Sequence, residues 1–150
     1  MRVLNSLVHY GLDITRLAFS GGQPLSPYIQ TYSVDLFLSK DHSDEQHIIN
    51  SELCAAAIIY APPSVKLEDE SKVKIAFDAD SVLFSDESEQ RYKKEVYVNE
   101  TYFLGGIAKD KVLEAFGAHI FFDDQDYHLE LASKVVPSGK VPYNSDSPLH

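Results

Sequence analysis

Two aspartates separated by one small residue follow an apolar segment in the middle of the chain. Asp78 and Asp80 come directly after the run KIAF and precede Val82 and Leu83. The carboxyl end of a parallel strand is where open α/β folds bind ligands. A carboxylate there can attack phosphorus to form an aspartyl-phosphate, and a second one can protonate the leaving oxygen and then activate water. The motif predicts phosphate hydrolysis, with Asp78 and Asp80 as catalytic residues.

A second pair of acids ends another apolar run, HIFF. Asp123 and Asp124 follow it directly, and two strands that end in carboxylates can converge on one cation when they are neighbours in a parallel sheet. Mg²⁺ suits such a site because it is a hard cation that takes carboxylate and phosphate oxygens together. We therefore expect Mg²⁺ as cofactor, held by Asp78, Asp80, Asp123 and Asp124. For the second pair taken alone, a solvated turn after a buried strand is an equally good interpretation.

A lysine lies between the two acidic motifs. Lys109 follows Gly105 and Gly106 near the start of a predicted helix that leads into the Asp123 strand. A lysine in that place could hold the nucleophilic carboxylate and the phosphoryl oxygens as negative charge builds on them. Lys111 is close enough in sequence to be the alternative candidate. His128 is given no role, because it has no cysteine or histidine partner at metal-ligand spacing.

The elements that must position these side chains alternate between helix and strand. A helix is expected over Arg2–Tyr10 because its apolar residues recur at helical spacing. Strands are expected at LDITRLAF, VDLFLS, KVKIAF, YVNETYF and AHIFF, and helices at SDEQHIINSELCAAAIIYA, KDKVLEAFG and DYHLELASKVV. This alternation predicts an α/β fold whose strands are mostly parallel.

A degenerate internal repeat is also predicted. Shifting the sequence by 84 positions lays Phe19 and Phe37 over Phe103 and Phe121 without a gap. The first copy has a leucine where the second has Lys109, so the charged groups belong to the second copy. We therefore divide the chain into a degenerate unit at 1–63, a linker at 64–72, a catalytic-type unit at 73–143 and a tail at 144–150, which could pack as one domain.

Composition narrows the classes of partner. The net charge is −10, which argues against nucleic acid, because binding there rests on lysine and arginine neutralising phosphates. No segment approaches the roughly 20 apolar residues of a membrane-spanning helix. The single cysteine, Cys54, forms no internal disulfide, so a cytoplasmic location is expected.

The order of these motifs resembles the haloacid-dehalogenase superfamily. More narrowly, FDADSVLFSDESE, YFLGGIAKDKVL, HIFFDDQ and GKVPY are similar to the cytosolic 5′-nucleotidase type I family, and the resemblance covers nearly the whole chain. It implies a haloacid-dehalogenase-like Rossmannoid three-layer sheet and Mg²⁺-dependent hydrolysis of nucleoside 5′-monophosphates to nucleoside and phosphate. It implies Asp78 as nucleophile, Asp80 as general acid and base that also binds the metal through its carbonyl, and Lys109 as the lysine beside the phosphate. Asp123 and Asp124 would complete the metal site.

The sequence departs from this family pattern between its acidic motifs. A strand ending in serine or threonine normally binds the phosphoryl oxygens there, and SDESEQRYKKEVYVNE contains none. A longer family segment is also missing between about Lys94 and Val96, so the fold is expected to be incomplete. The alternative to an enzyme is therefore a non-catalytic remnant that binds Mg²⁺ or a partner without turnover. Loss of a central strand exposes its neighbours, and an exposed sheet edge invites pairing with a second copy of the chain.

Overall fold

A computed structural model describes residues 2–60, 72–79, 82, 100–104 and 107–146 of the chain. Within this part of the chain, none of the helices has the length and apolar character needed to cross a membrane. The predicted linker at 64–72 lies almost entirely outside the described residues, as does Asp80.

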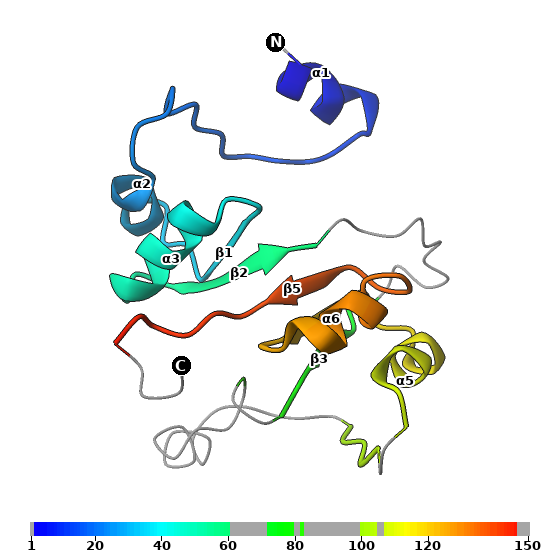
Figure 1. Ribbon diagram of the computed structural model, residues 1–150. Coiled ribbons are helices and arrows are strands. Elements are labelled where there is room, and N and C mark those ends of the chain that lie inside the picture. Colours follow the sequence, from blue (N-terminus) through cyan, green and yellow to red (C-terminus); the bar gives the residue numbers. More distant parts are fainter. Residues whose placement is uncertain (1, 61–71, 80–81, 83–99, 105–106, 147–150) are drawn as a thin grey trace.

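Helices and strands are interleaved along the described chain, as expected for an α/β fold, with α1 followed by α2 and β2 followed by β3 (Figure 1). The first half contains α1 (Arg2–His9), α2 (Ser26–Thr31), β1 (Leu36–Ser39), α3 (His42–Asn50) and β2 (Ala55–Ile59). The second half contains β3 (Ile75–Phe77), α5 (Lys109–Phe116), β4 (Ile120–Asp123), α6 (Asp126–Ala132) and β5 (Ser138–Lys140).

All five strands form one mixed sheet in the order β1-β2-β5-β4-β3. β1 pairs with β2 in parallel, and β3, β4 and β5 are parallel to one another. The two groups meet where β2 pairs antiparallel with β5, through Ile58 opposite Lys140 and Ile59 opposite Gly139. Because each of these strands contributes its last residues to this junction, the carboxyl ends of β2 and β5 overlap in the middle of the sheet.

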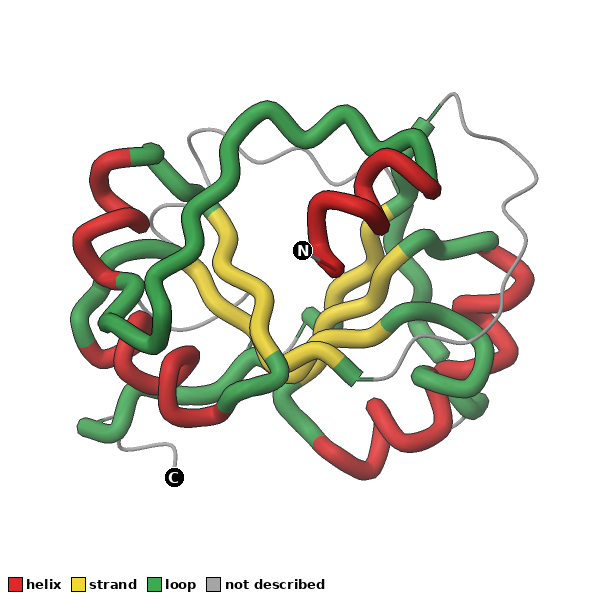
Figure 2. Tube along the Cα trace, turned by 90° about the horizontal axis from the view of Figure 1, so that it is seen from above, coloured by secondary structure: helices red, strands yellow, loops and turns green. Residues whose placement is uncertain are grey.

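The helices pack against the strands of their own half. Figure 2 shows α2 and α3 beside β1 and β2, and α5 and α6 beside β3, β4 and β5, while the N-terminal segment with α1 runs past the other side of the sheet. One buried cluster gathers Ile29, Ile48 and Ala56 under α3. A second is built around Phe121, Leu129 and Val136 between β4 and α6. Burial of these apolar faces, at about 25 cal/mol per Å², is what holds each helix to the sheet.

Four expectations about the elements were wrong. LDITRLAF forms no strand; its Leu12, Ile14 and Leu17 are exposed. Residues 100–103, the described part of YVNETYF, form no strand either. The helix expected to continue through CAAAIIYA ends at Asn50, and Ala55–Ile59 is strand β2, because its small side chains are buried between β1 and β5 and under α3. No element was expected after DYHLELASKVV, yet Ser138–Lys140 forms strand β5 through pairing with two strands.

Strand β5 fits its place because its central residue is a glycine. A Cβ atom on Gly139 would lie 2.8 Å from Cε1 of Phe122 and 3.3 Å from Cβ of Ala57. Real Cβ atoms do not approach ring carbons so closely, so the backbone of β5 passes against the Phe122 ring in a space that only glycine allows. The close approach explains how a short polar segment with no strand pattern can occupy the centre of the sheet.

Candidate active site

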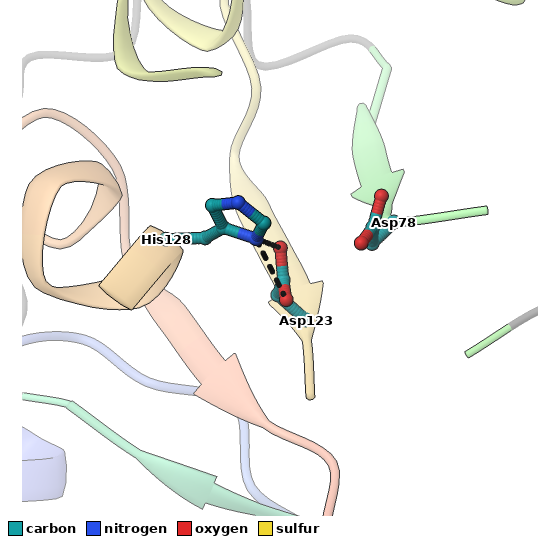
Figure 3. Close-up of side chains that lie close together, drawn as sticks. All are labelled: Asp78, Asp123 and His128. Atoms are coloured by element: carbon teal, nitrogen blue, oxygen red, sulfur yellow. Dashed lines mark hydrogen bonds and ion pairs between the residues drawn. The ribbon is translucent and has the colours of Figure 1, made fainter. Parts of the chain in front are cut away.

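The two parallel strands β3 and β4 bring Asp78 and Asp123 side by side. Phe77 is the register partner of Phe122, and the Asp78 backbone N–H donates to the Phe122 carbonyl at 2.8 Å. Asp123 is the last residue of β4 and Asp78 follows the last residue of β3. Figure 3 shows both carboxylates at the ends of these strands. The two strands that end in acids are therefore neighbours in a parallel arrangement, and the carboxylates of Asp78 and Asp123 lie close together as expected.

Lys109 joins the two carboxylates. Its Nζ lies 2.8 Å from Oδ2 of Asp78 and 2.8 Å from Oδ2 of Asp123. Burial by itself lowers the pKa of Lys109, but the hydrogen bonds to Asp123 and Asp78 outweigh it and hold that pKa above its ordinary value. The ammonium group therefore stays charged between the two acids throughout the physiological pH range.

Lys109 is placed there by the start of α5. It is the first residue of the helix, and Gly117, with φ 69°, ends the helix in the left-handed conformation that glycine adopts readily. Lys111 is two residues further on, which turns its side chain about 200° around the helix axis. Lys111 is exposed, and no ion pair between it and Asp78 or Asp123 is observed within the described residues.

His128 completes the cluster, although the sequence analysis gave it no role. Its Nδ1 lies 2.9 Å from Nζ of Lys109 and 3.1 Å from Oδ2 of Asp123, and Figure 3 shows the ring reaching from α6 toward Asp123. Lys109 thus has one acceptor for each of its three N–H donors. The usable signal was that a helix begins directly after the acidic strand, which brings its first turn close to the strand end.

Asp123 is the most confined member of the cluster. Its side chain is fully buried, and its Oδ1 accepts a hydrogen bond from the Gln125 backbone N–H at 2.9 Å. A buried carboxylate is costly unless it is paired and hydrogen-bonded. Lys109 and the Gln125 amide supply those partners, one on each oxygen, so the orientation of Asp123 is fixed from two directions.

Asp124 does not join this cluster. Its Oδ2 accepts a short hydrogen bond from the Tyr143 hydroxyl, while its Oδ1 is buried and has no hydrogen-bond partner among the described residues. The oxygens and nitrogens of Asp78, Asp123 and His128 instead form a group whose ligand atoms lie within 4.8 Å of one another. Asp80, which was predicted to be catalytic and to bind the metal, lies outside the described residues.

This donor set fits a divalent cation. Two carboxylates and one ammonium leave the cluster with a net negative charge, and each carboxylate offers two oxygens with two lone pairs apiece, of which Lys109 uses one on each residue. The orphaned buried oxygen of Asp124 is a further oxygen donor next to Asp123 in the chain. Hard carboxylate oxygens favour Mg²⁺ or Mn²⁺, and an imidazole nitrogen would add affinity for Mn²⁺.

A model of the 5′-nucleotidase family matches the chain in two pieces, residues 1–97 and 93–148. Together these pieces cover nearly the whole sequence, so the chain belongs to the 5′-nucleotidase family. The break between them falls at the position where the sequence analysis expected a family segment to be missing.

A curated relative is similar over the same range. The chain is 24% identical to "Cytosolic 5′-nucleotidase 1B" of Homo sapiens over 216 residues, which take in 96% of this chain and 35% of the relative. Because this chain has 150 residues, the alignment includes a long stretch of the relative without a counterpart here. The chain spans about a third of the relative's length. No solved structure matches the chain.

Proposed function

We propose that this chain carries the catalytic centre of a phosphohydrolase that converts nucleoside 5′-monophosphates to nucleoside and phosphate, in the cytoplasm. Family membership supports the reaction. The observation that carries the proposal is the bridge of the Lys109 ammonium to both Asp78 and Asp123 at 2.8 Å. An ammonium group held beside a carboxylate that could attack phosphorus is placed to stabilise the negative charge that builds on the phosphoryl oxygens.

In the proposed reaction, an oxygen of Asp78 attacks the phosphorus atom and the bond from phosphorus to the 5′ oxygen breaks. The nucleoside leaves with a proton from Asp80, which belongs to the same motif. Asp80 then takes a proton from water, whose oxygen attacks the phosphorus of the aspartyl-phosphate. Phosphate is released and the Asp78 carboxylate is restored, so atoms and charges balance.

Lys109 and His128 would hold this geometry. The Lys109 ammonium neutralises Asp78 before attack and faces the phosphoryl oxygens as negative charge moves onto them. His128 accepts from Lys109 through Nδ1 at 2.9 Å, so it acts as a positioning residue. Mg²⁺ held by Asp78, Asp123 and the Asp80 carbonyl would supply further positive charge at the phosphoryl group, with Asp124 next in the chain as a supporting acid.

A non-catalytic role is the second candidate. It is favoured by the two-piece match to the family model and by the long unmatched stretch of the relative. The break between the two matched pieces, at residues 93–97, lies between Asp78 and Lys109, where the family resemblance implies a phosphate-binding hydroxyl. In this case the cluster would bind Mg²⁺ or a partner without turnover.

Release of phosphate from AMP, IMP and deoxynucleoside monophosphates, with and without Mg²⁺, separates the two candidates. Turnover that needs Mg²⁺ and disappears in D78N supports the hydrolase. Absence of turnover, together with a rise in melting temperature when Mg²⁺ is added, supports the non-catalytic role. Turnover that is unchanged in D78N contradicts Asp78 as the nucleophile.

We also infer that the two halves descend from one duplicated α/β unit and that the sheet is part of a haloacid-dehalogenase-like three-layer fold. β1 and β4 begin and end 84 residues apart, and α3 and α6 begin 84 residues apart. This is the offset at which the two sequence segments align. The residues of the first copy that correspond to Asp123 and Lys109 are Ser39 and Leu25. Only the second copy therefore has the charged groups.

A further inference from the structure

A pocket lies where the two groups of strands meet, at the carboxyl ends of β2 and β5. Its volume is about 260 Å³, and it is lined by Lys40, His42, Ile58, Ile59, Tyr60, Asp126 and Lys140. These residues come from the β1–α3 connection, the end of β2, the start of α6 and the end of β5. Open α/β folds bind ligands outside the carboxyl ends of their strands, and this pocket lies at two such ends.

The pocket gathers two lysines and a histidine in a chain whose net charge is −10. Lys40, His42 and Lys140 line it from two segments far apart in sequence, whereas Asp126 is its single acidic lining residue. The Lys140 ammonium lies 2.5 Å from Oδ2 of Asp126, so these two charges neutralise each other. Lys40 makes no ion pair or hydrogen bond through its side chain within the described residues, which leaves the lining with a net positive charge.

The Asp126 carboxylate already has hydrogen-bond partners among its neighbours, and it holds Lys140 in place. Besides Lys140, it accepts a hydrogen bond from the Tyr60 hydroxyl at 2.6 Å. These two hydrogen bonds hold its pKa below the ordinary value. Lys140 has three N–H donors and Asp126 takes one, so two remain for a ligand. Asp41, which lies between Lys40 and His42, directs its carboxylate to the Ser43 and Asp44 amides of α3.

We propose that this pocket binds a small oxyanion of the phosphate class, with Lys40 and Lys140 as charged donors and His42 as a ring N–H donor. Its volume suits one phosphate group with its water, and it is smaller than the roughly 300–1,000 Å³ of a pocket for a drug-sized ligand. This pocket shares no lining residue with the cluster of Asp78, Lys109, Asp123 and His128. The site is therefore distinct from the proposed catalytic centre.

Calorimetric titration of inorganic phosphate in metal-free buffer tests the proposal on the intact chain. Without metal the Asp78 cluster is net negative, so it repels phosphate. The wild type should bind phosphate saturably, and K40M should weaken the affinity at least tenfold. K111M, which removes an exposed lysine of α5, and D78N should bind as the wild type does. The proposal is overturned if the wild type shows no saturable binding, if K40M binds normally, or if D78N loses binding.

Two further measurements keep the result interpretable. Equal melting temperatures of K40M and wild type show that the fold is kept; H42Q replaces K40M if they differ, and normal phosphate affinity in H42Q would count against the site. Competition with AMP and with adenosine identifies the source of the anion. Displacement of phosphate by AMP assigns the pocket to phosphate esters, and failure of AMP assigns it to the free ion. If adenosine, which has no phosphate group, displaces phosphate from the pocket, the proposal that the pocket recognises an anion is overturned.

Discussion

At the residue scale, the candidate centre depends on one ammonium group with three acceptors. Lys109 meets Asp78, Asp123 and His128 at distances between 2.8 and 2.9 Å. A lysine at a helix start opposes the helix dipole and costs a few tenths of a kcal/mol. The two carboxylates offset this cost locally, and such a conflict with local preference is typical of functional sites.

Replacing the nucleophile should abolish turnover without unfolding the protein. In D78N the amide oxygen is a poor nucleophile, so we expect phosphate release from AMP to fall by about 10³-fold or more. The isosteric side chain should leave the melting temperature within a few degrees. Steady-state phosphate release and thermal unfolding measure the two effects, with K111M as the control that changes neither.

His128 gives a sharper test of the role of Lys109. H128N keeps an acceptor near the place of Nδ1, whereas H128L removes it and leaves Lys109 one partner short. We expect kcat to fall about tenfold or more in H128L, with KM little changed, and to recover partly in H128N; loss of one hydrogen bond to a charged group corresponds to about 1.5–3 kcal/mol. Equal kcat in the two variants would show that His128 does not position Lys109.

At the scale of elements, α3 buries an acid that has no partner for one of its oxygens. Glu45 is only 1% exposed, and its Oε1 has no hydrogen-bond partner among the described residues. Burial raises the pKa of Glu45 to about 7, although the nearby Lys140 charge opposes this. The folded protein therefore holds the Glu45 proton more tightly than the unfolded chain does.

This shift makes stability depend on pH in a known direction. Because the pKa is about 7 when folded and 4.5 in its ordinary state, the stabilisation is complete below about pH 4.5 and is lost as pH rises through 7. The full difference is up to about 3 kcal/mol. E45Q, which is neutral at every pH, should match the wild type near pH 4.5 and be more stable at pH 8.5.

Urea unfolding at both pH values measures the effect of E45Q. E114Q, which changes an exposed glutamate of α5, serves as the control and should follow the wild type throughout. If E45Q and the wild type lose stability in parallel as pH rises, Glu45 is not the group that titrates.

The tight contact of β5 predicts a packing penalty. In G139A the new Cβ would meet the Phe122 ring at 2.8 Å, so we expect a loss of about 1–3 kcal/mol of unfolding free energy. F122L should create room, so the double variant G139A/F122L should lose less than the sum of the two single changes. Strict additivity would show that the contact with the ring is not the cause.

At the scale of the whole molecule, β1 and β3 each have one neighbour among the described strands. Side chains along these edges are substantially exposed, including Leu38 at 44% and Ile75 at 48%. Edge strands with exposed apolar side chains are templates for pairing with another chain. The family segment with no counterpart here would follow β3 in sequence, so we place the dimer contact at β3.

Light scattering coupled to gel filtration tests this dimer. We expect the apparent mass to rise with protein concentration, and the lysine introduced by I75K at the edge of β3 should lower it toward the monomer. L38K, at the opposite edge, should associate as the wild type does. A monodisperse monomer at the highest soluble concentration would contradict dimerisation through the sheet.

Much of the architecture was predictable because the residue pattern within a short segment is enough to indicate its strand or helix. The runs KIAF and HIFF are apolar and end in acids, so strands followed by carboxylates could be expected at β3 and β4. The same reasoning failed for Ala55–Ile59, whose alanines are good helix formers, since burial between two strands decides its conformation. It failed also for β5, whose Ser-Gly-Lys sequence has no strand signal.

The order of amino acids establishes the kinds of group present and which predicted strand each acid follows: Asp78, Asp80, Asp123 and Asp124 at strand ends, and a lysine near a helix start. Which of these groups meet depends on the tertiary structure. It selected Lys109 over Lys111 through the rotation of α5, brought in His128 from α6 and turned Asp124 toward Tyr143. The physical reason is that strand periodicity is local, whereas the meeting of side chains from separate elements depends on how those elements pack.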